Sequence, residues 1–159
     1  MVGRSSWADK RLMARLYYRG MAEENGKPKR GRNARLLGVR PSIDIDVEQV
    51  PKDWLDEQGY LLPETERKSS EESVTVAIRN TKGMSVSLSI EGLPPFRKPP
   101  KFGGTGKDPL WQIDDSKIVG DIEAVQDSPT HVSILPSATM LLEKYEAALA
   151  QTQNEWEKV

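Results

Sequence analysis

The most constraining feature of the sequence lies near its C-terminal end, where an alternating segment runs directly into a helical one. Residues 130–136 alternate as a half-buried strand does, with Val132, Ile134 and Pro136 on one face and His131, Ser133 and Leu135 on the other. A proline cannot donate to a β-ladder, so we expect the strand to end at Pro136. His131 is the only histidine in the chain, which makes this strand a candidate part of a site.

The residues after Pro136 predict a long amphipathic helix that closes the chain. Ser137 or Thr139 is available to cap its N-terminus. One apolar face then repeats at steps of three and four, through Leu142, Tyr145, Leu149, Thr152 and Trp156. The rest of the chain must therefore supply packing partners for both a histidine-bearing strand and a helix.

Composition limits the classes to which the protein can belong. The 159 residues suit a single domain, spanning residues 1–159, with one core. No segment approaches the roughly 20 apolar residues of a membrane helix, and the N-terminus lacks the apolar run of a signal peptide. We therefore expect no membrane partner and a cytoplasmic place of action, in the producing cell or in another. With no cysteine and one histidine, we expect no disulfide and no metal site.

Charge is divided unevenly along the chain. Residues 1–40 hold 11 lysines and arginines and 3 acidic residues, a balance of +8, whereas residues 41–159 hold 12 and 21, a balance of −9. This division indicates either an anionic ligand or partner near the N-terminal part, or two halves that pair with each other. The basic residues gather in a predicted loop at 23–35. No aromatic side chain is interleaved with them to stack on a base, which argues against nucleic acid.

The remaining segments predict short strands joined by turn-rich connections. We expect a helix at 7–15 and strands at 16–18, 43–47, 74–78, 84–90, 111–113 and 118–125. Residues 64–72, charged and rich in serine, are expected to be the most mobile segment. The glycine-rich stretch at 102–109 is not a phosphate loop, because Asp108 stands where that motif needs serine or threonine. The pattern as a whole predicts an α+β domain with a split, mostly antiparallel sheet.

Two of these strands carry polar side chains on one face. The segment 84–90 alternates, so that Met84, Val86, Leu88 and Ile90 face the core while Ser85, Ser87 and Ser89 face the other way. Such small hydroxyl groups leave room for a ligand to approach, although an ordinary exposed strand face looks the same. In the strand at 43–47, Asp44 and Asp46 are expected to face water.

Four segments together resemble a known family. They are Leu16–Gly20 (Leu-Tyr-Tyr-Arg-Gly), Thr81–Ser87, Trp111–Asp127 and Thr130–Trp156. In this order and spacing they resemble the small ADP-ribosyltransferase-like toxins exported by type VI secretion systems. The resemblance implies an ADP-ribosyltransferase-like split sheet, NAD as the substrate, action in a recipient cytoplasm and a cognate immunity protein that protects the producer.

The resemblance also implies roles for individual residues. Arg19, at a strand end, would grip the pyrophosphate or ribose of NAD, because guanidinium matches such oxygens in two-point contacts. Ser85, with Gly83 opening the approach, would hold the ribose side, and Tyr18 or Tyr17 would cover the nicotinamide. His131 would hydrogen-bond a ribose hydroxyl or orient the acceptor. The resemblance thus implies catalytic roles for His131 and Ser85, and NAD-binding roles for Tyr18, Arg19, Gly83 and Ser85.

One departure from the family pattern leaves a second reading open. Most ADP-ribosyltransferases carry a glutamate on a late strand, where its carboxylate stabilises the oxocarbenium-like transition state. Here the late strand carries His131, and the nearest glutamates in sequence are Glu123 and Glu143. The chain is therefore either an NAD-using enzyme or a non-catalytic interaction module whose basic loop and acidic face dock a partner protein. Arrest of growth on expression in a bacterial cytoplasm would favour the toxin.

Overall fold

The computed structural model describes residues 15–30 and 37–159, so residues 7–14 of the predicted helix and residues 31–35 of the basic loop lie outside the described residues. The described strands are β1 (Leu16–Gly20), β2 (Glu23–Glu24), β3 (Lys27–Pro28), β4 (Val47–Pro51), β5 (Ser73–Ala77), β6 (Met84–Ser87), β7 (Leu110–Asp114), β8 (Ile122–Gln126), β9 (His131–Pro136), β10 (Met140–Leu141) and β11 (Glu157–Lys158). The described α-helix is α2 (Leu142–Gln151). Single 3-10 turns lie at Lys52–Trp54, Glu64–Glu66, Pro95–Arg97, Pro100–Phe102, Asp115–Lys117 and Gln153–Glu155.

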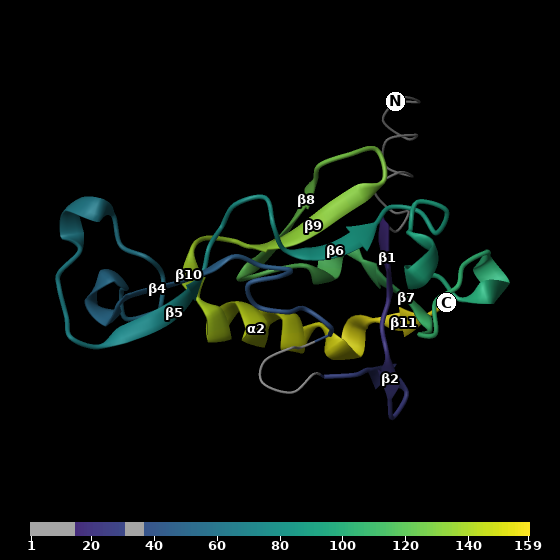
Figure 1. Cartoon of the computed structure of the whole chain (residues 1–159), viewed down its shortest axis with the longest axis horizontal. Helices are drawn as coiled ribbons and strands as arrows, with labels where there is room; N and C mark the ends of the chain where they lie inside the picture. The colour runs from purple at the N-terminus through teal and green to yellow at the C-terminus, as the bar shows by residue number, and fades with distance from the viewer. Residues whose placement is uncertain (1–14, 31–36) are drawn as a thin grey trace, which may run out of the picture.

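The strands form one large sheet and two small ones. The six-stranded sheet has the order β11-β7-β1-β6-β9-β8, the three-stranded sheet the order β10-β5-β4, and β2 pairs with β3 alone. Every pair of named strands is antiparallel, which confirms the antiparallel α+β class. Figure 1 shows α2 lying along the large sheet, with the β4–β5 hairpin extending away from it as an arm.

The core lies between α2 and the central strands of the large sheet. Tyr145 and Leu149 of α2 are 0% and 1% exposed. They belong to a buried cluster that also holds Tyr17, Met84, Val86, Trp111, Ile113, Val132 and Ile134. The residues of α2 pack on the core-facing side chains of β1, β6, β7 and β9, which lie inside the sheet. No helix in the described part of the chain is long and apolar enough to cross a bilayer.

The C-terminal helix is shorter than predicted. It spans 10 residues from Leu142 to Gln151 and begins without a side-chain cap. Neither Ser137 nor Thr139 caps it; the Thr139 hydroxyl instead accepts from the backbone N–H of Arg79 at 3.0 Å. At the other end, the Thr152 hydroxyl donates to the carbonyl of Leu149 at 2.6 Å. The chain then extends at Trp156 so that β11 can pair with β7, which a continuing helix would prevent.

The strand predicted at 43–47 was placed too early, because the structure has β4 at Val47–Pro51. Residues 40–45 form a turn instead. The Asp44 carboxylate accepts from the backbone N–H of Arg40 at 2.7 Å and from its guanidinium at 3.0 Å, and Ser42 has a φ of 69°. Asp44 is therefore a turn residue rather than part of a solvated strand face.

The basic loop predicted at 23–35 contains a hairpin at its start. Glu23 pairs with Pro28 and Glu24 with Lys27. Asn25 and Gly26 have φ values of 56° and 78°, the positive values that a two-residue turn of type I′ requires. The Asn-Gly dipeptide was the signal for this hairpin.

The alternating strands also differ from prediction in their exposure. The strand predicted at 84–90 ends at Ser87, because the Ser87 hydroxyl donates to the carbonyl of Ser89 at 2.6 Å and turns the chain. Only Ser85 of the predicted open face is exposed, since Ser87 is buried. The histidine strand β9 is buried on both faces from Val132 to Pro136 rather than half-buried. It lies inside the sheet between β6 and β8, and the Tyr145 hydroxyl of α2 donates to its carbonyl at Ile134.

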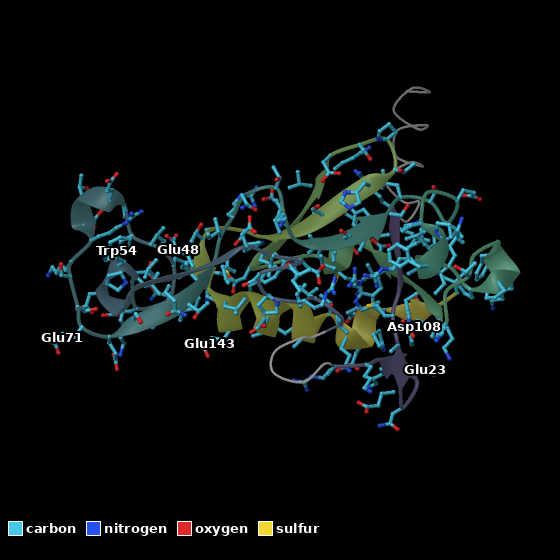
Figure 2. All side chains as sticks on the ribbon, in the orientation of Figure 1. Glu23, Glu48, Trp54, Glu71, Asp108 and Glu143 are labelled. Carbon is cyan, nitrogen blue, oxygen red and sulfur yellow. The ribbon has the colours of Figure 1, made fainter. Side chains whose placement is uncertain are left out.

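The arm carries the segment that the sequence marks as most mobile. Figure 2 shows Glu48, Trp54 and Glu71 on this arm, at the far end of the molecule from Asp108. The Arg67 guanidinium lies over the Trp54 ring, 5.0 Å from its centroid, and Nε donates to the carbonyl of Leu62 at 3.0 Å. The mobility of residues 64–72 stays a prediction.

Candidate functional site

A cavity of about 340 Å³ opens where β1, β6 and β9 meet the loop after β6. This volume lies within the range of roughly 300–1,000 Å³ that small-molecule sites occupy. The cavity is lined by Arg19, Arg40, Asp44, Ser85, Val86, Ser87, Gly92, Leu93, Pro94, Phe96, Arg97, Thr130 and His131. Three of the residues that the sequence singles out, Arg19, Ser85 and His131, therefore surround one space.

The cavity exists because β1 and β6 pair only briefly. Their register is a single pair, Tyr18 with Ser87, whereas β1 pairs with β7 along its whole length. Beyond that pair, the Arg19 guanidinium bridges to β6, with Nη1 donating to the carbonyl of Ser85 at 2.8 Å. Gly20 then lets the neighbouring loop approach, since a Cβ at this position would overlap the carbonyl of Arg97. The sheet is thus split at the end of β1.

Arg19 carries a buried positive charge at this split. Its side chain is 3% exposed, and Nη2 donates to the carbonyl of Leu37 at 3.2 Å. Its Nε has no hydrogen-bond partner among the described residues. Desolvation and then the nearby charge of Arg97 lower the pKa of Arg19 to about 10, so the guanidinium stays protonated at neutral pH. Within residues 15–30 and 37–159, no carboxylate forms an ion pair with it.

Two further arginines give the cavity a positive balance. Arg97, half-buried, donates from Nη1 to the carbonyl of Gly20 at 3.3 Å. Arg40 is bound to Asp44 by two guanidinium contacts, of 3.0 and 3.3 Å. The described lining therefore holds three arginines and one aspartate, and that aspartate is already paired with Arg40. Such a lining favours an anionic ligand.

Ser85 and His131 reach the cavity from the two strands beside this split. In the β6–β9 ladder Ser85 lies opposite Ser133, and Ser87 lies opposite His131. Directly opposed residues share a face of the sheet, so Ser85 and His131 lie on the same face. Ser85 is exposed, and the His131 side chain is 41% exposed.

Sequence reasoning missed Asp127, which lies beside His131. The β8–β9 turn brings its Oδ1 to 2.6 Å from Nδ1 of His131, and its Oδ2 accepts from the Ser133 hydroxyl at 3.2 Å. The signal was the Asp-Ser-Pro sequence four residues before the histidine, which is a turn pattern that folds an aspartate back onto the next strand.

The other predicted NAD-binding residues do not line the cavity. Tyr18 is half-buried and lies opposite Ser87, so it shares the face of Ser85 without reaching the cavity wall. Gly83 directly precedes β6. A Cβ at this position would overlap the carbonyl of Ile134, so the glycine allows the backbones of the two segments to lie close together. Tyr17 is buried on the opposite face, and its hydroxyl donates to Asp115 at 2.6 Å.

Neither glutamate nearest to His131 in sequence lies at this cavity. Glu123 pairs with Arg79 at 2.7 Å. Glu143 lines a different cavity at the start of α2, together with Glu146. Burial, with the charge of Glu143 adding to it, raises the pKa of Glu146 to about 7. Among the described residues, the one carboxylate in the lining of the arginine-rich cavity is that of Asp44.

Comparison with known proteins gives one match. A family model described as the Tse2 ADP-ribosyltransferase toxin matches residues 16–157. No curated protein and no solved structure shows significant similarity to the chain. The match begins at β1 and ends in β11, so it includes every strand that surrounds the cavity. Among the described residues, no three histidine, aspartate or glutamate side chains are grouped as metal ligands.

Proposed function

Because the chain belongs to the Tse2 ADP-ribosyltransferase toxin family, we propose that it is an antibacterial toxin that takes NAD as its substrate. It binds NAD in the arginine-rich cavity and breaks the bond between the ribose and the nicotinamide. It acts in the cytoplasm of a recipient cell, reached through a type VI secretion system, and a cognate immunity protein neutralises it in the producer.

The observation that carries this proposal is the buried charge of Arg19, which has no ion-pair partner among the described residues. A charge taken out of water costs several kcal/mol unless a partner offsets the loss. Arg19 has two backbone carbonyls and no carboxylate as partners among the described residues, and its Nε is left without an acceptor. A diphosphate would supply the missing acceptors and countercharge, and Arg97 lies close enough to share it. The residues of the cavity thus fit the anionic centre of NAD.

The reacting end of NAD belongs beside Ser85 and His131 in this proposal. Cleavage of a glycosidic bond passes through an oxocarbenium-like state, so the ribose needs hydrogen-bonding groups that hold it in place while charge develops. The Ser85 hydroxyl and the His131 imidazole are such groups, and they share the face of the sheet at the cavity. Tyr18 lies on that face, beside the cavity, and is the aromatic side chain proposed to cover the nicotinamide.

Direct measurement of NAD turnover tests the proposal. We expect the purified protein to bind NAD in a calorimeter and to release nicotinamide. Arg19→Ala should abolish both, and Arg19→Lys should restore little, because an ammonium cannot make a planar two-point contact. Arg67→Ala is the matched control, since Arg67 packs on Trp54 in the arm. Equal activity in Arg19→Ala and wild type would contradict the proposed role of Arg19.

Expression in bacteria separates the toxin from the interaction module. We expect the chain to arrest growth when it is produced in the cytoplasm without an immunity protein, and the Arg19→Ala variant to be tolerated. A positively lined cavity favours an immunity protein that presents acidic side chains, and salt should weaken their association. A protein that is harmless, releases no nicotinamide and still binds an acidic partner would instead be an interaction module.

A further inference from the structure

The carboxylate of Asp127 is fixed by the hairpin that joins β8 and β9. Its Oδ1 lies 2.6 Å from Nδ1 of His131, and its Oδ2 accepts from the hydroxyl of Ser133 at 3.2 Å. The backbone N–H of Asp127 donates to the carbonyl of His131 at 3.1 Å, which closes the turn. The Ser128 hydroxyl accepts from the backbone N–H groups of His131 and Thr130. Both carboxylate oxygens therefore have a set place.

We propose that Asp127 is a positioning residue that makes His131 the proton acceptor of the cavity. An ionised carboxylate only accepts hydrogen bonds, so the contact with Asp127 requires the proton of the neutral ring to sit on Nδ1. The lone pair of the neutral ring then lies on Nε2, for which no described residue is a hydrogen-bond partner. Since His131 lines the cavity, this nitrogen is available to a reacting group. The inference rests on the proposed function.

The chemical step that His131 would serve is proton removal from the acceptor. In ADP-ribose transfer, the bond between the ribose C1′ and the nicotinamide nitrogen breaks, and its electron pair leaves with neutral nicotinamide. A new bond forms between C1′ and an oxygen or nitrogen of the acceptor, which is water or a target side chain. The acceptor loses one proton, and Nε2 of His131 takes it, so that the ring becomes an imidazolium beside the Asp127 carboxylate.

No other group in the cavity is as well arranged for this step. In the part of the lining that the structure describes, Asp44 is the one carboxylate, and its two oxygens accept from the Arg40 guanidinium. Glu123, the glutamate nearest in sequence before His131, is paired with Arg79. In the proposal, His131 held by Asp127 therefore takes the proton of the acceptor, and no carboxylate of the described lining does so.

The tautomer of His131 can be read without any enzyme assay. The chain has a single histidine, so a long-range ¹H–¹⁵N correlation spectrum of the ¹⁵N-labelled protein shows one imidazole. We expect the neutral ring of the wild type to carry its proton on Nδ1, and the ring of Asp127→Ala to carry it on Nε2. Ser128→Ala is the matched control, because Ser128 shapes the same turn without touching the ring. A wild-type ring protonated on Nε2, or an unchanged tautomer in Asp127→Ala, would overturn the proposal.

Kinetics then connect the tautomer to turnover. Asp127→Ala, or the nearly isosteric Asp127→Asn if the alanine variant does not fold, should lower kcat for nicotinamide release at least tenfold. General base catalysis supplies about 10²–10⁴-fold. KM for NAD should change less than about threefold, because Asp127 does not line the cavity. Ser128→Ala should keep the wild-type kcat, and equal losses in the Ser128 and Asp127 variants would overturn the positioning role.

A wild type with the expected tautomer and no nicotinamide release would overturn the NAD chemistry of the proposal while leaving the orientation of His131 supported. The tautomer spectrum and the turnover assay therefore tell the failure of this inference apart from the failure of the proposed function.

Discussion

Removing the hydroxyl of Tyr145 tests how α2 holds the two strands that carry Ser85 and His131. Met84 and Ile134 lie opposite each other at the end of the β6–β9 ladder. The Tyr145 hydroxyl accepts from the backbone N–H of Met84 at 3.2 Å and donates to the carbonyl of Ile134 at 2.8 Å. Tyr145 is 0% exposed, so water cannot replace either bond. We expect Tyr145→Phe to keep the packing of the ring and to remove both hydrogen bonds of the hydroxyl, while Met84 and Ile134 stay paired in the ladder.

The size of the effect follows from the two hydrogen bonds that the hydroxyl makes. A hydrogen bond contributes about 0.5–1.5 kcal/mol net, so the variant should lose roughly 1–3 kcal/mol of unfolding free energy. For a domain of this size that corresponds to a fall of roughly 2–12 °C in the melting temperature. Such a loss is a large part of the stability of a typical domain, which is about 5–15 kcal/mol.

Urea unfolding followed by tryptophan fluorescence measures this loss, since the chain has four tryptophans. Tyr60→Phe is the matched control, because the Tyr60 hydroxyl donates to Asp121 near the surface, and its midpoint should stay close to that of the wild type. An unfolding free energy of Tyr145→Phe within about 0.5 kcal/mol of the wild type would refute the bridging role of this hydroxyl.

Three further predictions concern packing, the cavity and pH. Leu149→Ala should lower the unfolding free energy by about 2–5 kcal/mol in the same assay, because Leu149 is 1% exposed. Gly20→Ala should lower the unfolding free energy by about 1–3 kcal/mol and weaken NAD binding in the calorimeter. The new Cβ overlaps the carbonyl of Arg97 and displaces a wall of the cavity. Unchanged NAD binding would contradict this account of Gly20. The third prediction follows from the pKa of Glu146, which lies at about 7 in the folded protein against an ordinary value of 4.5. Because its pKa is raised, the Glu146 carboxyl holds a proton more tightly in the folded state than in the unfolded state. The stability that this proton contributes is complete below pH 4.5 and is lost as the pH rises through 7. After allowance for solvent screening of a half-buried group, the effect is on the order of 1 kcal/mol. Unfolding measured between pH 4.5 and 8 should show it in the wild type and not in Glu146→Gln.

Several features of the fold could be predicted from the sequence because they depend on local pattern. The alternation around Tyr17, Val76 and Ile134 marks β1, β5 and β9, and the structure has strands at each place. The same pattern predicts a helix after Pro136, and α2 begins six residues later. Arg19, Ser85 and His131 were singled out on sequence and resemblance, and they line one cavity.

Errors arose where distant segments compete with a local pattern. The apolar repeat continues to Trp156, yet the helix ends at Gln151 because β11 gains a partner in β7 that lies more than 40 positions away in sequence. The alternation at 84–90 continues past Ser87, yet the strand ends there because the serine hydroxyls bond to the turning backbone. Periodicity reports which way a side chain points in an isolated element, and it contains no information about these competing partners.

The sequence alone therefore determined the class of the fold, the absence of cysteine chemistry and the residue types available to a site. The tertiary structure alone decided that Arg19 is buried with no ion-pair partner among residues 15–30 and 37–159, that β1 and β6 separate after one residue pair, and that Asp127 contacts His131. These properties depend on strand order and on the path of loops, which bring together groups that are remote in sequence. Burial and charge pairing arise from such neighbours, so no local pattern could reveal them.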